Sequence, residues 1–325
     1  MGRFFNKPYA YAYIFAIFLT LSTVLALLGV FVIPSPGEAV RTPTPSTAAP
    51  TRLATPAPSA EEAGQAAASS PSPSPTPFVP VITETSYRDG NISITIETLR
   101  EFRTDLYIAD VELSSPHYLK TALAKDAFGL NIREKTSVMA ARNGAILAVN
   151  GDYYGANKAG FVLKNGVLYR DSVRTKSGGE DLVIYDNGAF GLITEKSTDA
   201  SSLIEQGVTQ LLAFGPALVK DGLIAVSMDG EVGQAITSNP RTAIGMVEPL
   251  HYVFVVSDGR TQKSSGLSLY QLAEVMVSCG CVVAYNLDGG GSSTMVFNGR
   301  IVNVPTTNGD KIAERSVSDI VYIGA

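Results

Sequence analysis

The sequence predicts an α+β protein with a mixed, largely antiparallel sheet and a few packed helices, preceded by one transmembrane helix. Three observations predict this class. Residues 9–33 form one uncharged apolar run, and residues 34–82 are rich in Pro, Ser, Thr and Ala. Residues 83–325 alternate short apolar runs with tight-turn signals and contain few helical patterns, which is typical of α+β folds.

The first predicted element is a membrane helix over residues 9–33. Twenty-five residues at about 1.5 Å each exceed a hydrocarbon core of roughly 30 Å. Arg3 and Lys7 precede the run, and positive residues favour the cytoplasmic side. We therefore expect residues 1–8 to be a cytoplasmic tail and the rest of the chain to be extracytoplasmic, in a single-pass protein of the cell membrane. A cleaved signal peptide is the alternative, although its apolar region is usually only about 7–15 residues.

The second predicted element is a disordered linker over residues 34–82. It holds 12 of the 18 prolines and few large apolar side chains, so it cannot bury enough surface to offset the entropy of ordering. Its Pro-Ser and Pro-Thr repeats favour extended polyproline II, a semi-rigid spacer. We expect it to hold the domain away from the bilayer.

The third predicted unit is one domain over residues 83–325, long enough to bury a core without disulfides. Helices are predicted around residues 133–142 and 268–278. Strands are predicted over residues 91–96, 106–113, 145–149, 282–287 and 318–323. Hairpin turns are predicted at Asn165-Gly166, residues 186–188, Asp221-Gly222 and Asn298-Gly299, because these pairs adopt the backbone that tight turns require.

Composition excludes several classes of function. The net charge is -5 and there is no basic tract, so nucleic acid is not an expected partner. The only two cysteines, Cys279 and Cys281, read as buried thiols rather than as a metal site. The only two histidines, His117 and His251, lie outside the polar segments described next, which disfavours His-assisted nucleophilic catalysis and a His-rich zinc centre. Catalysis by carboxylate side chains is the chemistry that these exclusions leave.

The strongest candidate site follows the strand predicted at 282–287. Asn286 and Asp288 precede Gly289, Gly290 and Gly291, and then come Ser292 and Ser293. Three glycines cost backbone entropy, so a function should require them. Their amides, free of Cβ atoms, could form a concave anion site. The spacing matches neither a Walker loop nor a nucleophile elbow.

Three further segments place polar side chains at strand ends, where catalytic groups concentrate. They contain Asn150 and Asp152 before two tyrosines, Arg241 after Asn239-Pro240, and Asp258 before Gly259-Arg260. Aromatic faces beside acids suit sugar rings, and the planar guanidinium of Arg suits phosphate. Each segment alone also fits a purely structural alternative, namely a solvated turn or a surface arginine.

Together these segments resemble the phosphodiester glycosidase family, which includes bacterial exopolysaccharide-related proteins. The resemblance runs from about residue 145 to the C-terminus, through Asn150 to Tyr154, Arg241 to Gly245, Asp258 to Arg260, and Asn286 to Met295. Asp152 stands where the family frequently has glycine. The family implies hydrolysis of the bond between an anomeric carbon and a phosphate oxygen, on a phosphodiester-linked glycan of the cell envelope or an exopolysaccharide.

The implied chemistry assigns roles to the candidate residues. We expect Arg241 and the loop from Gly289 to Ser293 to bind the phosphate, with Arg260 nearby. Asp288 would act as base or nucleophile or would organise the loop, and Asp152 and Asp258 are the second catalytic candidates. Asn150 and Asn286 would bind sugar hydroxyls. The sequence identifies no cofactor with certainty, although a site at which Asp152, Asp258 and Asp288 converge would suit calcium.

Two other functions fit the same residues. A non-catalytic surface module could bind anionic glycopolymer through the loop and Arg241. A phosphodiesterase could cleave the P–O bond on the other side and release sugar phosphate.

Overall fold

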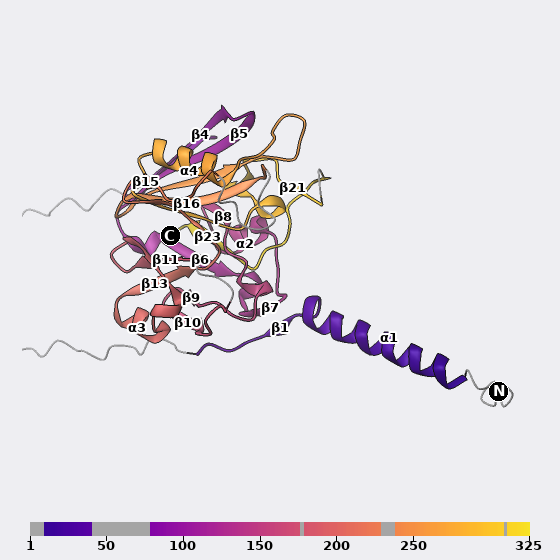
Figure 1. Cartoon of the computed structure of the whole chain (residues 1–325). Coiled ribbons are helices and arrows are strands. Elements are labelled where there is room, and N and C mark those ends of the chain that lie inside the picture. Colours follow the sequence, from indigo (N-terminus) through magenta and orange to yellow (C-terminus); the bar gives the residue numbers. More distant parts are fainter. Residues whose placement is uncertain (1–9, 41–78, 176–178, 229–237, 309–310) are drawn as a thin grey trace, which may run out of the picture.

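A computed structural model describes residues 10–40, 79–175, 179–228, 238–308 and 311–325. It confirms the predicted α+β class, and every strand pairing in these ranges is antiparallel. The domain has two stacked sheets with helices on their outer faces (Figure 1).

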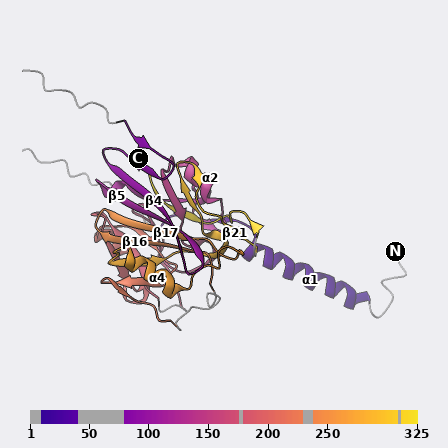
Figure 2. The same cartoon turned by 90° about the horizontal axis from the view of Figure 1, so that it is seen from above.

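The larger sheet has nine strands in the order β15-β14-β18-β16-β17-β5-β4-β3-β2. In that order the strands are Leu223–Ile224, Ala217–Lys220, Val283–Asn286, Arg241–Glu248, His251–Ser257, Thr104–Leu113, Ile92–Glu101, Ser86–Arg88 and Val81–Ile82. Alternate residues of β4 and β5 are buried, as expected for strands with one face on the core. Figure 2 shows β4, β5, β17 and β16 side by side.

The second sheet has five strands in the order β20-β19-β8-β23-β6, which are Arg300–Ile301, Met295–Phe297, Leu147–Asn150, Asp319–Ile323 and Leu119–Leu123. The main core lies between the two sheets, and it includes Phe254 and Tyr285 from the larger sheet and Val149 and Met295 from the smaller one. Helix α4, Leu269–Ser278, covers the outer face of the larger sheet, and α2, Thr136–Arg142, covers that of the smaller sheet.

A smaller subdomain completes the fold. It contains a three-stranded sheet, the β9-β10 hairpin and the short helix α3, Ala200–Glu205, which share one apolar cluster. The strands are β12 Phe190–Ile193, β11 Asp181–Tyr185, β13 Val208–Leu212, β9 Val162–Lys164 and β10 Val167–Arg170. The hairpin β21-β22, Thr306–Thr307 and Lys311–Ile312, lies beside the 3₁₀ turn η6, Gly290–Ser292. Elsewhere in the described ranges, 3₁₀ turns occur at η1 Pro116–Tyr118, η2 Ala124–Asp126, η3 Tyr154–Ala156 and η4 Glu195–Ser197.

The apolar N-terminal run is the helix α1, Ala10–Phe31, which leaves the domain as a separate rod (Figure 1). Its window from Ala12 to Gly29 has a mean hydropathy of 2.2 and is not buried by the domain. Length and composition suit a membrane span, and a signal sequence has the same properties. The predicted cytoplasmic tail, residues 1–8, lies outside the described residues.

The predicted linker is described only at its two ends, and residues 41–78 lie outside the described residues. At its start, strand β1, Ser35–Pro36, pairs with β7, Gly129–Leu130. The chain directly after α1 is therefore bound to the domain, whereas a free spacer was expected there.

Candidate functional site

The glycine-rich loop connects the two sheets. It leaves β18 of the larger sheet at Asn286, forms η6, and enters β19 of the smaller sheet at Met295. Neighbouring segments approach the loop so closely that side chains would not fit, which explains its glycines. A Cβ on Gly289 would lie 2.9 Å from the carbonyl oxygen of Pro240, and one on Gly291 would lie 3.0 Å from Oγ1 of Thr307. Gly290 has a φ of +61°, which favours glycine.

A cavity of about 350 Å³ opens beside this loop. It brings together residues from three of the four polar segments that the sequence singled out. Its lining consists of Phe214, Gly215, Pro216, Asn239, Arg241, Arg260, Leu269, Asn286, Asp288, Gly289, Gly290 and Arg315. Asp288 is the one carboxylate among these lining residues, and it faces three arginines.

Asp288 is held by its neighbours in a fixed position. Its Oδ2 accepts hydrogen bonds from Ser292 Oγ at 2.6 Å and from the Arg315 guanidinium at 2.9 Å. Only 7% of the residue is exposed. Burial raises the pKa of Asp288, while the charge of Arg315 and the hydroxyl of Ser292 act in the opposite direction. The contacts of Oδ2 leave Oδ1 as the less engaged oxygen, with one Arg315 contact at 3.2 Å.

The three guanidinium groups differ in how they are held. Arg241, at the start of β16, is buried and donates through Nε to the Leu267 carbonyl at 2.9 Å. Arg260 donates to Oδ1 of Asn239 at 3.0 Å. Arg315 was not predicted, yet it contacts both Asp288 and Ser292. Guanidinium forks are suited to phosphate oxygens, so this group of arginines forms a candidate anion site.

The loop amides contribute less to that site than the sequence suggested. The amide of Gly290 donates to the Pro240 carbonyl at 2.8 Å, and the amides of Ser292 and Ser293 donate to loop carbonyls at 3.2 Å. These amides are engaged within the protein. These three amides are therefore not free to bind a ligand, while Gly289 and Gly291 allow the loop to pack closely on its neighbours.

The two predicted asparagines lie in different surroundings. Asn286 lines the cavity; its Nδ2 donates to the Gly215 carbonyl at 2.7 Å, while its buried Oδ1 has no protein partner. Asn150 is buried behind the cavity. It donates to the Asp288 carbonyl at 2.6 Å and accepts from Thr242 Oγ1 at 2.8 Å. Asn286 thus borders the cavity with a buried oxygen that has no protein partner, whereas Asn150 positions the backbone of Asp288.

Asp152 lies in a separate buried cluster and does not line the cavity. Its Oδ2 accepts from Lys164 Nζ at 3.2 Å, and that ammonium also donates to Asp319 at 2.7 Å. All three side chains are at most 1% exposed. Burial, with the nearby Asp152 carboxylate, raises the pKa of Asp319 to about 7, while Lys164 acts in the opposite direction. Asp152 thus joins the segment after β8 to Lys164 of β9, and Lys164 in turn joins β9 to β23.

Asp258 is also turned away from the cavity. Its Oδ1 accepts from the Val304 amide at 2.8 Å, and its Oδ2 accepts from Tyr107 Oη at 3.2 Å. Burial raises the pKa of Asp258, and these hydrogen bonds lower it. The contacts tie the end of β17 to the loop before β21. Of the three catalytic candidates, the structure places only Asp288 in the cavity.

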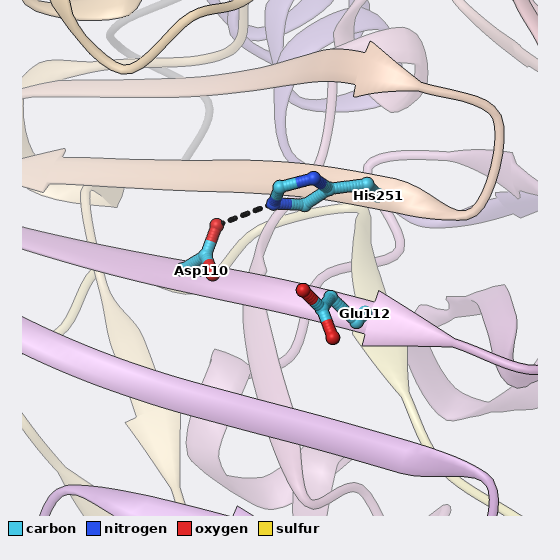
Figure 3. Close-up of side chains that lie close together, drawn as sticks. All are labelled: Asp110, Glu112 and His251. Atoms are coloured by element: carbon cyan, nitrogen blue, oxygen red, sulfur yellow. Dashed lines mark hydrogen bonds and ion pairs between the residues drawn. The ribbon is translucent and has the colours of Figure 1, made fainter.

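The three aspartates do not converge as calcium binding would require. Among the described residues, the one group of three with ligand atoms within 4.8 Å of one another is Asp110, Glu112 and His251. Figure 3 shows this group on β5 and β17, with His251 bonded to Asp110 at 2.7 Å. It lies at the opposite end of these strands from Asp258. The candidate site accordingly has no metal-ligand set among the described residues.

Comparisons with known proteins point to one family. A model of the family described as "Phosphodiester glycosidase" matches residues 143–324, a span that contains every predicted site residue and Arg315. The SPbeta prophage-derived uncharacterized protein YomE of Bacillus subtilis is 33% identical over 199 residues, covering 60% of this chain and 30% of that protein. The human N-acetylglucosamine-1-phosphodiester alpha-N-acetylglucosaminidase is 29% identical over 179 residues, which cover 49% of this chain and 33% of that protein. The chain thus spans about a third of these relatives.

A solved structure has the same fold. The catalytic domain of the zebrafish N-acetylglucosamine-1-phosphodiester alpha-N-acetylglucosaminidase, auto-inhibited by its pro-peptide, superposes with a TM-score of 0.57 at 21% identity. The match covers 72% of this chain and 83% of that one.

Proposed function

Since the chain belongs to the phosphodiester glycosidase family, we propose that it hydrolyses a glycosyl-1-phosphodiester, releasing the sugar and leaving a phosphate monoester. The observation that carries this proposal is the cavity in which one buried carboxylate, Asp288, faces Arg241, Arg260 and Arg315. A phosphodiester carries one negative charge, and three guanidinium groups suit the larger charge that develops as the C1–O bond breaks.

The single carboxylate fits this leaving group. Glycosidases usually need two carboxylates, one of which protonates the departing oxygen. A phosphate monoester departs without that proton, because its charge is spread over several oxygens and is neutralised by the arginines. Asp288 then acts on the other face of the sugar, either as nucleophile at C1 through Oδ1 or as the base that activates water. Asn286, which lines the cavity, is the residue proposed to hydrogen-bond a sugar hydroxyl.

The proposed location is the outer face of the cell membrane. Helix α1 would span the bilayer with residues 1–8 in the cytoplasm, and the domain would face outward. The substrate would then be a phosphodiester-linked glycan of the cell envelope or an exopolysaccharide. The apolar composition of α1 supports this placement.

Hydrolysis in ¹⁸O-labelled water tests the reaction. Cleavage at C1 places the label on the free sugar, and we expect this result with a synthetic glycosyl-1-phosphodiester. Label on phosphorus together with release of sugar phosphate would instead establish the phosphodiesterase. Binding without turnover would establish a non-catalytic glycopolymer module.

Replacement of the carboxylate tests the role of Asp288. We expect Asp288→Asn to lower kcat by roughly 10³-fold, as expected when a group that acts only in the transition state is lost. The control is Asp221→Asn, because Asp221 lies in a distant hairpin turn with a φ of +50° that Asn tolerates. Unchanged turnover in Asp288→Asn would remove Asp288 from the chemistry.

A further inference from the structure

The chain that follows α1 is bound to the domain by a short strap, residues 32–40. Strand β1 pairs with β7, with Ser35 opposite Leu130 and Pro36 opposite Gly129. The bonding continues on both sides of the strand pair. The Gly37 amide donates to the Phe128 carbonyl at 2.8 Å, and Asn131 Nδ2 donates to the Ile33 carbonyl at 3.3 Å. The strap thus begins within two residues of the end of the helix.

The fit between the strap and the domain depends on two glycines. A Cβ on Gly129 would collide with the Ser35 carbonyl oxygen and would lie 2.7 Å from Pro36 Cα. A Cβ on Gly37 would lie 2.8 Å from two ring carbons of Phe128. Real Cβ atoms do not approach so closely, so each surface is shaped to accept the other.

With α1 in the bilayer, as proposed above, this docking places one face of the domain at the level of the lipid headgroups. Figure 1 shows α1 leaving the domain beside β1 and β7. Phe31, the last residue of α1, lines a cavity of about 240 Å³ together with Arg133, Tyr153 and Lys158 of the domain. The end of a membrane helix lies where phospholipid phosphates lie, so this cavity opens into the headgroup layer.

The charges at this cavity favour an anion. Neither Arg133 nor Lys158 forms an ion pair within the described part of the chain. Arg133 lies against the Tyr153 ring at 5.7 Å, and its buried Nε has no hydrogen-bond partner. Glu38, the one carboxylate of the strap, is exposed. Basic side chains at the membrane surface attract anionic lipids.

We propose that the strap clamps the domain directly onto the bilayer, and that Arg133 and Lys158 bind the phosphate of an anionic phospholipid headgroup in the cavity beside Phe31. This inference rests on the proposed membrane location of α1. The distance between the domain and the membrane is then set by the strap.

Energy transfer from a single tryptophan tests the clamp, because the chain contains no Trp. The full chain carrying Asn157→Trp, beside the cavity, is placed in nanodiscs that contain a dansyl-labelled lipid. We expect strong transfer, and weak transfer from Leu223→Trp in β15, a strand that lies on the opposite side of the domain from α1 in Figure 1. Adding Gly129→Val to Asn157→Trp should reduce transfer to the level of the distant probe. Equal transfer with and without Gly129→Val would overturn the clamp.

Retention of phosphatidylglycerol tests the headgroup site. After release from nanodiscs of equimolar phosphatidylglycerol and phosphatidylcholine, native mass spectrometry gives the ratio of the two bound lipids. We expect that ratio to fall about fivefold for Arg133→Gln and again for Lys158→Gln, and to be unchanged in the exposed control Lys196→Gln. Unchanged ratios in all three would overturn the site, and displacement by excess inorganic phosphate would assign it to free phosphate. Failure of the wild-type chain to enter nanodiscs would refute the membrane location itself.

Discussion

At the scale of single residues, the candidate site is defined by one carboxylate whose ionisation depends on its neighbours. Asp288 is buried, which disfavours its charge, and it is paired with Arg315, which favours it. Arg315 is 43% exposed at its side chain, so the guanidinium can contact a ligand as well as Asp288. One arginine therefore sets the charge of the carboxylate and also contributes to the anion site.

Replacing Arg315 with Gln separates these two effects. Without the guanidinium, the effect of burial is opposed only by hydrogen bonds such as that from Ser292, so the pKa of Asp288 rises further. If ionised Asp288 is required, the acidic limb of the kcat/KM profile moves to higher pH. We also expect the plateau to fall by roughly 10–100-fold, because a charged hydrogen bond to the phosphate is lost. Arg315→Lys should return the acidic limb of the kcat/KM profile towards its wild-type pH. It should restore the plateau value of kcat/KM less completely. A limb that stays in place would show that Arg315 does not control Asp288.

Arg315 also shows what sequence patterns omit. The cavity residues that the sequence predicted lie at strand ends or beside glycines, where local patterns point to loops that carry function. Arg315 lies in an irregular segment between β22 and β23, and it reaches Asp288 only through the tertiary fold. Conversely, Asp152 and Asp258 have the same local pattern as Asp288, yet the fold turns both away from the cavity. A strand end predicts an exposed position, and it does not predict the direction of the side chain.

At the scale of elements, the glycine loop is a packed crossing between sheets. Gly290 has a φ of +61°, and a Cβ there would lie 2.9 Å from the Arg260 guanidinium. Gly222 has a φ of +76° with no atom within 4 Å of its Cβ position. At both Gly290 and Gly222, a non-glycine residue would be strained by the positive φ. Only at Gly290 would the added side chain also meet another residue, Arg260.

Gly290→Ala and Gly222→Ala therefore form a matched pair. Each should lower the free energy of unfolding by about 1 kcal/mol, because non-glycine residues avoid positive φ. Only Gly290→Ala should displace Arg260 and raise KM several-fold. Urea unfolding and steady-state kinetics measure the two effects. Equal KM values in both variants would show that Arg260 does not contact substrate.

Asn150 links elements of both sheets behind the site. It bonds Asp288 and Thr242 from the side of the larger sheet, and it accepts from the Thr294 amide at 3.2 Å. Asn150→Ala leaves these buried groups unpaired, so we expect the free energy of unfolding to fall by about 2–4 kcal/mol. The exposed hairpin variant Asn187→Ala should lose a few tenths of a kcal/mol. A similar loss in both variants, measured by urea unfolding, would contradict this structural role.

The success of sequence-based prediction differs among elements for a physical reason. The hairpin at Asn165-Gly166 and helix α4 were predicted, because turn chemistry and apolar periodicity act over a few neighbouring residues. Strand β1 was not predicted, since it consists of Ser35 and Pro36 within a proline-rich tract and forms only by pairing with β7. Short strands stabilised by distant partners carry no local signal.

At the scale of the whole molecule, the site lies where the chain passes from one sheet to the other. A buried ionic cluster lies close to this crossing. Lys164, Asp152 and Asp319 join the β9-β10 hairpin to β23 of the smaller sheet. A Cβ on Gly151 would lie 2.5 Å from Asp319, so the chain before Asp152 is packed directly on this cluster. The charge state of the cluster should therefore affect the stability of the whole domain.

The pH dependence of stability tests this cluster. The pKa of Asp319 is raised from 3.8 to about 7 in the folded protein. Between these values the folded state binds a proton that the unfolded state has lost, so this group makes stability fall as pH rises from about 4 to about 7. Asp319→Asn cannot titrate. Relative to wild type, it should therefore become more stable by about 2–4 kcal/mol across that range.

Urea unfolding of the full chain in detergent at several pH values measures this difference. Asp221→Asn is the control, because it removes a carboxylate from an exposed hairpin and should leave the wild-type slope unchanged. Lys164 titrates far above this range, since the pKa of its ammonium is raised by Asp152 and Asp319 against the effect of burial. The difference between wild type and Asp319→Asn would thus report Asp319 alone. Parallel curves for these two proteins would mean that Asp319 is already ionised at acidic pH, with its charge fully compensated by Lys164.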